Sequence, residues 1–218
     1  MDTRLQKYRG MIFDLDGVLV DTATYHYLAW RRLARELGFE FTEGDNERLK
    51  GVSRMRSLEI VLEVGGLSLS DAEKQAAAAK KNAWYVEYLC ALDERALLPG
   101  AKDYLEYLRQ DGRRIALGSA SKNAPLILER LNIGRFFDAV IDGNSVGRAK
   151  PDPEVFLKGA GLVSLPPKDC AVFEDSRAGI EAAKRGGMFA VGVGRKELLP
   201  GADMYIASLA DCYGKQKN

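Results

Sequence analysis

Short apolar runs separated by helical patterns fill most of this chain. The first run, 11–13, is short enough for a buried strand, and five similar runs follow after residue 97. The six runs that predict strands are 11–13, 115–118, 139–141, 171–173, 189–192 and 205–207. Helical patterns lie between the later runs, and such alternation is typical of a parallel sheet with right-handed crossovers. We therefore predict an α/β fold in which helices flank a parallel sheet.

Residues 22–97 contain no strand pattern and instead predict a group of helices. The apolar residues between 25 and 38 recur at helical spacing. A second helical stretch is interrupted at 51–53, and a third begins at Ser70 and Glu73, which form a capping-box pattern. These helices would therefore pack together as a unit of their own.

This helical segment interrupts the α/β pattern directly after its first strand. An insertion at that point can fold as a cap over the edge of the sheet. We predict a discontinuous core domain made of residues 1–20 and 95–218, and a helical cap domain made of residues 21–94.

Composition excludes several classes of function. The chain has 218 residues and a net charge of +1, which gives no basic surface for nucleic acid. No apolar run approaches the roughly 20 residues that span a bilayer, and the N-terminal residues lack the apolar core of a signal peptide. Cys90, Cys170 and Cys212 lack metal-ligand spacing and are expected to be reduced thiols. We expect a cytoplasmic monomer that binds neither nucleic acid nor membranes.

Two aspartates one residue apart, Asp14 and Asp16, follow the first predicted strand. Ligands of open α/β sheets bind beyond the carboxyl ends of the strands. Two neighbouring carboxylates repel each other unless a cation or a shared proton lies between them, and Mg²⁺ takes oxygen ligands of this kind. One carboxylate could then attack phosphorus while the other transfers a proton. A surface turn is the alternative interpretation.

Three later strand ends carry matching chemistry. Residues 119–123 offer hydroxyl groups and a helix N-terminus to an anion, although such clusters equally often only cap a helix. Lys150 could neutralise a phosphoryl oxygen, whereas the usual lysine is simply solvated. Glu174 and Asp175 add two acids, which favour a metal site if they lie near Asp14, although acids are common before helices.

These motifs resemble those of the haloacid dehalogenase superfamily. Four segments match its motifs in order along nearly the whole chain: DLDGVLVDT, the serine after the second strand, AKPDP and FEDSRAG. The resemblance implies a Rossmann-like core with a parallel sheet, and an all-helical cap inserted after the first strand. Further segments resemble the sugar-phosphate mutases of this superfamily: DTATYHYLAW, LKGVSRMRSL, KKNAWY, SASKNAP and GVGR.

The resemblance implies a reaction and roles for the core residues. The reaction is the conversion of β-D-glucose 1-phosphate to D-glucose 6-phosphate through glucose 1,6-bisphosphate, the small-molecule partners that we expect. Asp14 would become the aspartyl phosphate, and Asp16 would be the general acid and base. The transferring phosphoryl group would be held by Ser119, the backbone of Ala120 and Lys150. The ligands of Mg²⁺ would be Asp14, the carbonyl of Asp16, Glu174 and Asp175.

The same resemblance assigns roles in the cap. Arg54 would bind the second phosphate of the bisphosphate, since its guanidinium can hold phosphate oxygens bidentately. Its partners on the core would be Ser121, Lys122 and Asn123. Cap closure would be linked to Asp16 by Thr22, His26 and Lys81. The sugar pocket would be lined by Gly51, Val52 and Trp30, of which the tryptophan and the valine could equally be core residues.

Other functions on the same scaffold are less consistent with these residues. A sugar-phosphate phosphatase is the alternative enzyme, but it would lack the cap arginine and the histidine–lysine pair. A protein that only binds sugar phosphates would have lost Asp14 or Asp16. A dehalogenase is disfavoured because Asp16, Glu174 and Asp175 suit Mg²⁺-dependent phosphoryl transfer.

Overall fold

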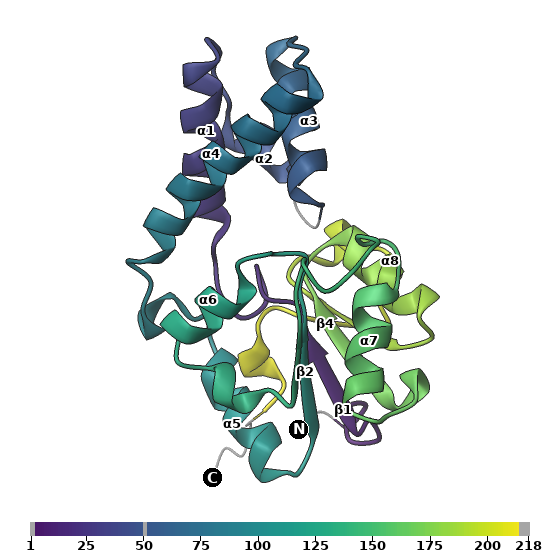
Figure 1. Ribbon diagram of the computed structural model, residues 1–218. Helices are drawn as coiled ribbons and strands as arrows, with labels where there is room; N and C mark the ends of the chain where they lie inside the picture. The colour runs from purple at the N-terminus through teal and green to yellow at the C-terminus, as the bar shows by residue number, and fades with distance from the viewer. Residues whose placement is uncertain (1–2, 50–51, 214–218) are drawn as a thin grey trace.

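Six parallel strands form a single sheet at the centre of the protein (Figure 1). The computed structural model describes residues 3–49 and 52–213. The strands are β1 (Gly10–Phe13), β2 (Arg114–Gly118), β3 (Ala139–Ile141), β4 (Cys170–Glu174), β5 (Phe189–Val193) and β6 (Met204–Ile206). Their order is β3-β2-β1-β4-β5-β6, and each neighbouring pair is parallel. The predicted parallel α/β fold is confirmed.

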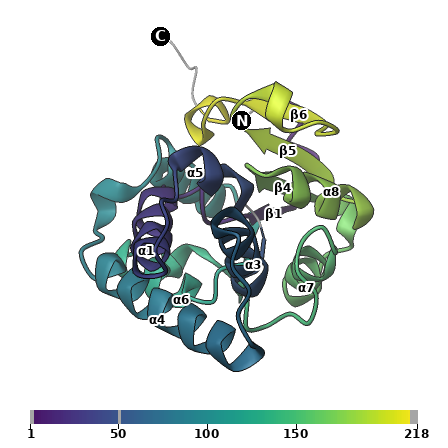
Figure 2. The same cartoon turned by 90° about the horizontal axis from the view of Figure 1, so that it is seen from above.

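Both faces of the sheet are buried because helices cover each of them (Figure 2). On one face lie α5 (Ala101–Gln110) and α6 (Ala124–Arg130), and on the other lie α7 (Glu154–Leu162) and α8 (Arg177–Arg185). Short 3-10 segments join these elements at Glu47–Leu49, Glu94–Ala96, Gly134–Phe136, Pro167–Asp169, Lys196–Leu198 and Leu209–Asp211. Burial on both faces explains why the strands are continuous apolar runs rather than alternating ones.

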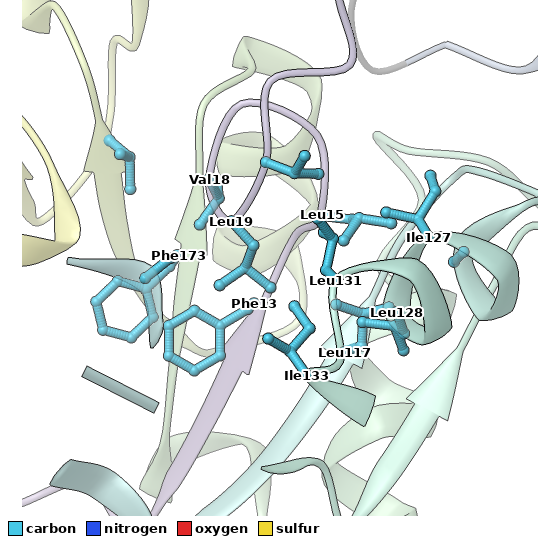
Figure 3. Close-up of a cluster of buried hydrophobic side chains, with 14 of the residues drawn as sticks. Phe13, Leu15, Val18, Leu19, Leu117, Ile127, Leu128, Leu131, Ile133 and Phe173 are labelled. Carbon is cyan, nitrogen blue, oxygen red and sulfur yellow. The ribbon is translucent and has the colours of Figure 1, made fainter. Parts of the chain in front are cut away.

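The core beneath α6 shows how the sheet is fixed. Phe13 and Phe173, from the adjacent strands β1 and β4, stack with ring centroids 4.6 Å apart. They lie in one buried cluster with Leu117 of β2 and with Ile127 and Leu128 of α6 (Figure 3). This packing fixes the ends of the central strands, and therefore the positions of the polar residues that follow them.

Four helices between the first two strands form a separate group beyond one end of the sheet (Figure 1). They are α1 (Ala23–Glu36), α2 (Glu43–Asn46), α3 (Arg54–Gly65) and α4 (Asp71–Leu89). We call this group the cap. An antiparallel bridge between Val20 and Leu97 pairs the two segments that join it to the core. The domain boundaries derived from the sequence stay a prediction.

Helix α4 begins as its capping box predicts. The side chain of Ser70 accepts a hydrogen bond from the Glu73 N–H, and the Glu73 carboxylate accepts one from the Ser70 N–H. The helix ends at Leu89. Within the described ranges, no helix is long and apolar enough to cross a membrane. The three cysteines are free thiols, and Cys170, the first residue of β4, is buried.

Replacing Ser70 by alanine should lower the free energy of unfolding by about 1 kcal/mol, because the N-terminal N–H groups of α4 lose their acceptor. Urea denaturation measures this change. The control is Ser68→Ala, since Ser68 is exposed and makes no side-chain hydrogen bond in the described structure. Equal free energies of unfolding for the two variants would show that the capping box at Ser70 and Glu73 does not stabilise the protein.

Candidate active site

A cavity of about 900 Å³ lies between the cap and the carboxyl ends of the strands. Both parts of the protein line it, so the site is complete only when the cap is in place. Every described residue that the sequence singled out lines this cavity: Asp14, Asp16, Thr22, His26, Trp30, Val52, Arg54, Lys81, Ser119, Ala120, Ser121, Lys122, Asn123, Lys150, Glu174 and Asp175. Gly51, expected in the sugar pocket, lies outside the described residues.

The order of the strands explains why these residues meet. The chain builds the sheet outward from β1 in one direction and from β4 in the other, so the crossovers diverge between these two strands. A crevice forms at such a switch point in open α/β sheets. Asp14 directly follows β1, its N–H donates to the Phe173 carbonyl at 2.9 Å, and Glu174 ends β4. The two acids therefore lie side by side although 160 positions separate them in the chain.

Lys150 lies between these two carboxylates. Its Nζ is 2.5 Å from Asp14 Oδ1 and 2.5 Å from Glu174 Oε1, and all three side chains are buried. Burial alone would lower the pKa of Lys150, but Asp14 and Glu174 together raise it above its usual value. The lysine is therefore a fixed positive charge beside the carboxylate of Asp14, where a phosphoryl group would need neutralisation.

The carboxylates themselves are destabilised in their charged form. Burial raises the pKa of Asp14 well above its usual value, and Glu174, Asp16 and Asp175 raise it further, while Lys150 opposes them. Burial also raises the pKa of Asp16, although Thr22 lowers it by donating its hydroxyl to Asp16 Oδ1. A raised pKa suits a carboxyl group that must hold a proton and release it. Thr22 is fully buried, so it also fixes the direction of the Asp16 side chain.

Two glycines allow the acids to approach the loops so closely. A Cβ at Gly17, whose φ is +80°, would lie 2.0 Å from Asp175 Oδ2. A Cβ at Gly179 would lie 1.9 Å from the Glu174 carboxyl carbon. Asp175 is therefore held against the loop that carries Asp14 and Asp16, and any side chain at either glycine would displace an acid.

The oxygen ligands at this site fit a magnesium ion whose coordination would be completed by substrate. Both carboxylate oxygens of Glu174 already accept hydrogen bonds. Oε1 accepts from Lys150, and Oε2 accepts from the N–H and from the hydroxyl of Ser176, both at 2.8 Å. Across residues 3–49 and 52–213, no three acidic, histidine or cysteine side chains form a metal cluster by themselves. Magnesium is commonly bound by one or two carboxylates together with phosphate and water. Asp14, Asp175 and the Asp16 carbonyl supply such oxygens, and the role of Glu174 as a ligand stays a prediction.

Residues 119–123 form a hydrogen-bonded loop after β2. The Ser119 hydroxyl accepts from the Ser121 N–H at 3.0 Å, and the Ser121 hydroxyl accepts from the Asn123 N–H at 3.2 Å. A neighbouring turn supports the loop, because the Asn144 side chain donates to the Lys122 carbonyl at 3.1 Å. Neither serine caps α6, whose N-cap residue is Asn123 and which has no side-chain capping hydrogen bond. The serines instead shape the loop that lines the cavity beside Lys150.

On the cap side, Lys81 and His26 form a pair. Lys81 Nζ lies 2.9 Å from His26 Nδ1 and 4.6 Å from the centroid of the Trp30 ring. Burial, followed by the charges of Lys81 and Arg54, lowers the pKa of His26 well below its usual value. The lowered pKa favours a neutral imidazole, and a charged Lys81 ammonium can only donate in this contact. Burial and the charge of Arg54 lower the pKa of Lys81 to about 7, while Asp16 opposes them.

Arg54 is the first residue of α3, and its side chain is half-buried in the cavity wall. No carboxylate within the described structure pairs with its guanidinium, whereas its neighbour Arg56 binds Glu59 and Glu63. Burial lowers the pKa of Arg54, which shows that its charge is incompletely compensated. An anionic group of a ligand would supply the missing partner.

The structure adds polar residues that the sequence did not single out. Asn82 of α4 and Asn46 of α2 both line the cavity. Asn46 is buried, and its side-chain oxygen has no hydrogen-bond partner. Asn82 directly follows Lys81, a predicted site residue, and this adjacency in the sequence could have indicated that Asn82 also lies at the site. Nothing in the sequence around Asn46 distinguishes it from an ordinary residue of a helix end.

Comparison with known proteins identifies the class to which this site belongs. Residues 8–187, most of the chain, match the haloacid dehalogenase-like hydrolase family. The chain therefore belongs to this family, as its motifs predict.

Individual relatives are similar over nearly the full length. The chain is 44% identical over 205 residues to the β-phosphoglucomutase of Bacillus subtilis, covering 93% of this chain and 91% of that protein. It is 33% identical to a phosphorylated carbohydrates phosphatase of Thermotoga maritima, covering 82% of each. The crystal structure of β-phosphoglucomutase from Clostridium difficile, 40% identical, matches with a TM-score of 0.90 and covers 94% of this chain and 93% of that chain.

Replacing Lys81 by methionine should stabilise the protein in a pH-dependent way. The folded pKa of about 7 lies below that of a free lysine. Between these values the unfolded chain binds more protons, so wild-type stability rises with pH. The gain in the free energy of unfolding should therefore be about 3 kcal/mol larger at pH 6, where the buried charge is present, than at pH 9.

Urea denaturation between pH 6 and pH 9 measures this gain. Lys80→Met is the matched control, because Lys80 is exposed on the same helix and pairs with Glu36 at 2.5 Å. A gain for Lys81→Met that is the same at every pH would mean that this lysine does not titrate in the range.

Proposed function

We propose that this protein is an isomerase that interconverts β-D-glucose 1-phosphate and D-glucose 6-phosphate through an aspartyl phosphate and β-glucose 1,6-bisphosphate. It uses Mg²⁺ and acts on small-molecule sugar phosphates in the cytoplasm, as a monomer. The similarity to β-phosphoglucomutases, at 44% and 40% identity over nearly the whole chain, supports this assignment. The three free thiols are consistent with a reducing compartment.

One observation carries the proposal: a single cavity holds a reactive centre at its core end and an uncompensated arginine at its cap end. Asp14 and Lys150 form the reactive centre, and Arg54 is the arginine. A mutase must bind a bisphosphate in either orientation, with one phosphate at the nucleophile and the other away from it. Two separated cationic positions in one cavity of about 900 Å³ suit this requirement.

The reaction begins with Asp14 phosphorylated. The sugar hydroxyl at carbon 6 attacks phosphorus, its proton passes to Asp16, and the bond between phosphorus and the Asp14 carboxylate breaks. The product is the 1,6-bisphosphate, which binds again with its ends exchanged. Asp14 then attacks the phosphate at carbon 1, Asp16 returns a proton to the leaving oxygen, and glucose 6-phosphate is released. The aspartyl phosphate is thereby regenerated.

The other core residues stabilise charge during transfer. Lys150 is held 2.5 Å from Asp14 and would neutralise the phosphoryl oxygens. Ser119 and the Ala120 backbone line the same part of the cavity and would position that group. Magnesium, when bound by Asp14, Asp175 and the Asp16 carbonyl, supplies positive charge to the same oxygens and relieves the repulsion among the acids.

The cap residues would make transfer to sugar faster than transfer to water. An aspartyl phosphate is hydrolysed when water reaches it, so a mutase needs a closed site. Thr22 fixes Asp16, and the His26–Lys81 pair lies on the cap side of the same cavity. We infer that Arg54 binds the distal phosphate and thereby couples closure to the presence of a sugar phosphate.

A sugar-phosphate phosphatase is the alternative function on this scaffold. The Thermotoga relative, a phosphorylated carbohydrates phosphatase, is 33% identical, below the 44% of the mutase relative. The two functions share Asp14 and differ in whether sugar or water accepts the phosphoryl group.

Phosphorus NMR distinguishes the two activities. The protein with Mg²⁺, β-glucose 1-phosphate and a trace of glucose 1,6-bisphosphate should yield glucose 6-phosphate with little free phosphate. Asp14→Asn, which lacks the nucleophile, and EDTA treatment should each abolish conversion. Release of inorganic phosphate as the main product would overturn the mutase assignment in favour of the phosphatase.

Arg54→Ala should lower kcat/KM for β-glucose 1-phosphate about 100-fold, because a hydrogen-bonded charge contributes about 1.5–3 kcal/mol. Phosphorylation of Asp14 by acetyl phosphate, which has no distal phosphate, should stay within about twofold of wild type. Arg56→Ala is the control, since Arg56 lies on the same helix and its guanidinium is paired with exposed glutamates. Equal losses in both reactions would show that Arg54 does not act through a distal phosphate.

A further inference from the structure

A chain of hydrogen bonds runs from the phosphoryl-binding end of the cavity to the cap. It starts at the Ser119 hydroxyl, passes through Ser121, and reaches the Asn123 N–H. The Asn123 side chain then continues it, because Nδ2 donates to Asn82 Oδ1 at 2.9 Å. Asn82 belongs to helix α4, so this last bond crosses from the core to the cap.

Helix α4 is the part of the cap that reaches this loop. Figure 1 shows α4 descending from the top of the cap towards α6, and Figure 2 shows the two helices side by side. The same helix carries Lys81, whose Nζ is 2.9 Å from His26 Nδ1. Asn82 and Lys81, which are neighbours in α4, therefore contact the 119–123 loop and His26, respectively.

The bond to Asn82 also decides which way the Asn123 amide points. An asparagine amide has an oxygen acceptor and an NH₂ group with two donors. Asn82 Oδ1 takes one N–H of Asn123, which leaves the other N–H for the cavity that both residues line. Without this acceptor the amide could rotate and present its oxygen, which repels phosphate.

We propose that Asn82 is a positioning residue for sugar-phosphate binding: its side-chain oxygen orients the Asn123 amide towards a phosphate oxygen and ties α4 to the 119–123 loop. The inference rests on the proposed function, because that function places Asn123 at the distal phosphate. Asn82 acts through Asn123 and not on the transferring phosphoryl group, so its effect falls on substrate affinity.

The test compares Asn82→Ala with wild type. KM for β-glucose 1-phosphate should rise about tenfold, kcat should change less than twofold, and phosphorylation of Asp14 by acetyl phosphate should not change. Alanine favours helix, so the variant is expected to fold. Gln75→Ala is the control, because Gln75 is exposed on the same helix and makes no side-chain hydrogen bond in the described structure. A wild-type KM in Asn82→Ala would overturn the proposal.

A double-mutant cycle separates orientation of the amide from a general disturbance of the cap. In an Asn123→Ala background, the further replacement of Asn82 should leave KM unchanged, since there is no amide to orient. Effects that multiply would mean that Asn82 acts independently of Asn123, which contradicts the proposal.

Failure of the proposed function would be recognised separately. If the wild type releases phosphate from the sugar phosphate instead of isomerising it, the mutase assignment fails and the same KM comparison is made on hydrolysis. If the wild type neither isomerises nor hydrolyses the sugar phosphate, affinity is measured instead of KM. Calorimetry then gives the affinity of Asp14→Asn for glucose 1,6-bisphosphate, with and without the additional change Asn82→Ala. An affinity about tenfold weaker with Asn82→Ala supports the inference, and equal affinities overturn it.

Discussion

The contact of the Lys150 ammonium with Asp14 and Glu174 is the interaction on which the site depends. Three ionisable side chains are buried together, and each would be costly there without the others. Their positions come from three separate segments: the end of β1, the turn before α7 and the end of β4. The fold therefore has to bring these three segments together before Lys150 can contact both Asp14 and Glu174.

The same crowding of acids explains why a cation and a phosphate belong in this crevice. Lys150 contacts Asp14 and Glu174, Asp16 and Asp175 line the same cavity, and burial raises the pKa of both aspartates of the first loop. The absence of a side chain at Gly17 and Gly179 leaves room for Asp175 and Glu174, respectively. The protein thus keeps negative charge where a magnesium ion, when bound, would compensate it.

The cap has the opposite electrostatic character. Burial lowers the pKa of both Arg54 and Lys81, and the only histidine, His26, stacks on Tyr85 with ring centroids 4.0 Å apart. Lys150 on the core side and Arg54 and Lys81 on the cap side place cationic side chains at both ends of the cavity, which suits a ligand with a phosphate group at each end. The Asn82–Asn123 bond joins the two parts at one side, so the loop that faces the phosphate and the helix that carries Lys81 are linked.

The parallel sheet, the helical insertion and the residues of the first loop could be predicted from the sequence, because each depends on a local pattern: apolar runs, helical spacing and adjacent acids. The family resemblance then supplied the list of site residues, and those among residues 3–49 and 52–213 all line one cavity. Three facts required the tertiary structure: Glu174 is held by Lys150 and Ser176, Arg54 pairs with no carboxylate among the described residues, and Asn82 contacts Asn123. These facts depend on distances between segments far apart in the chain, which local pattern does not specify.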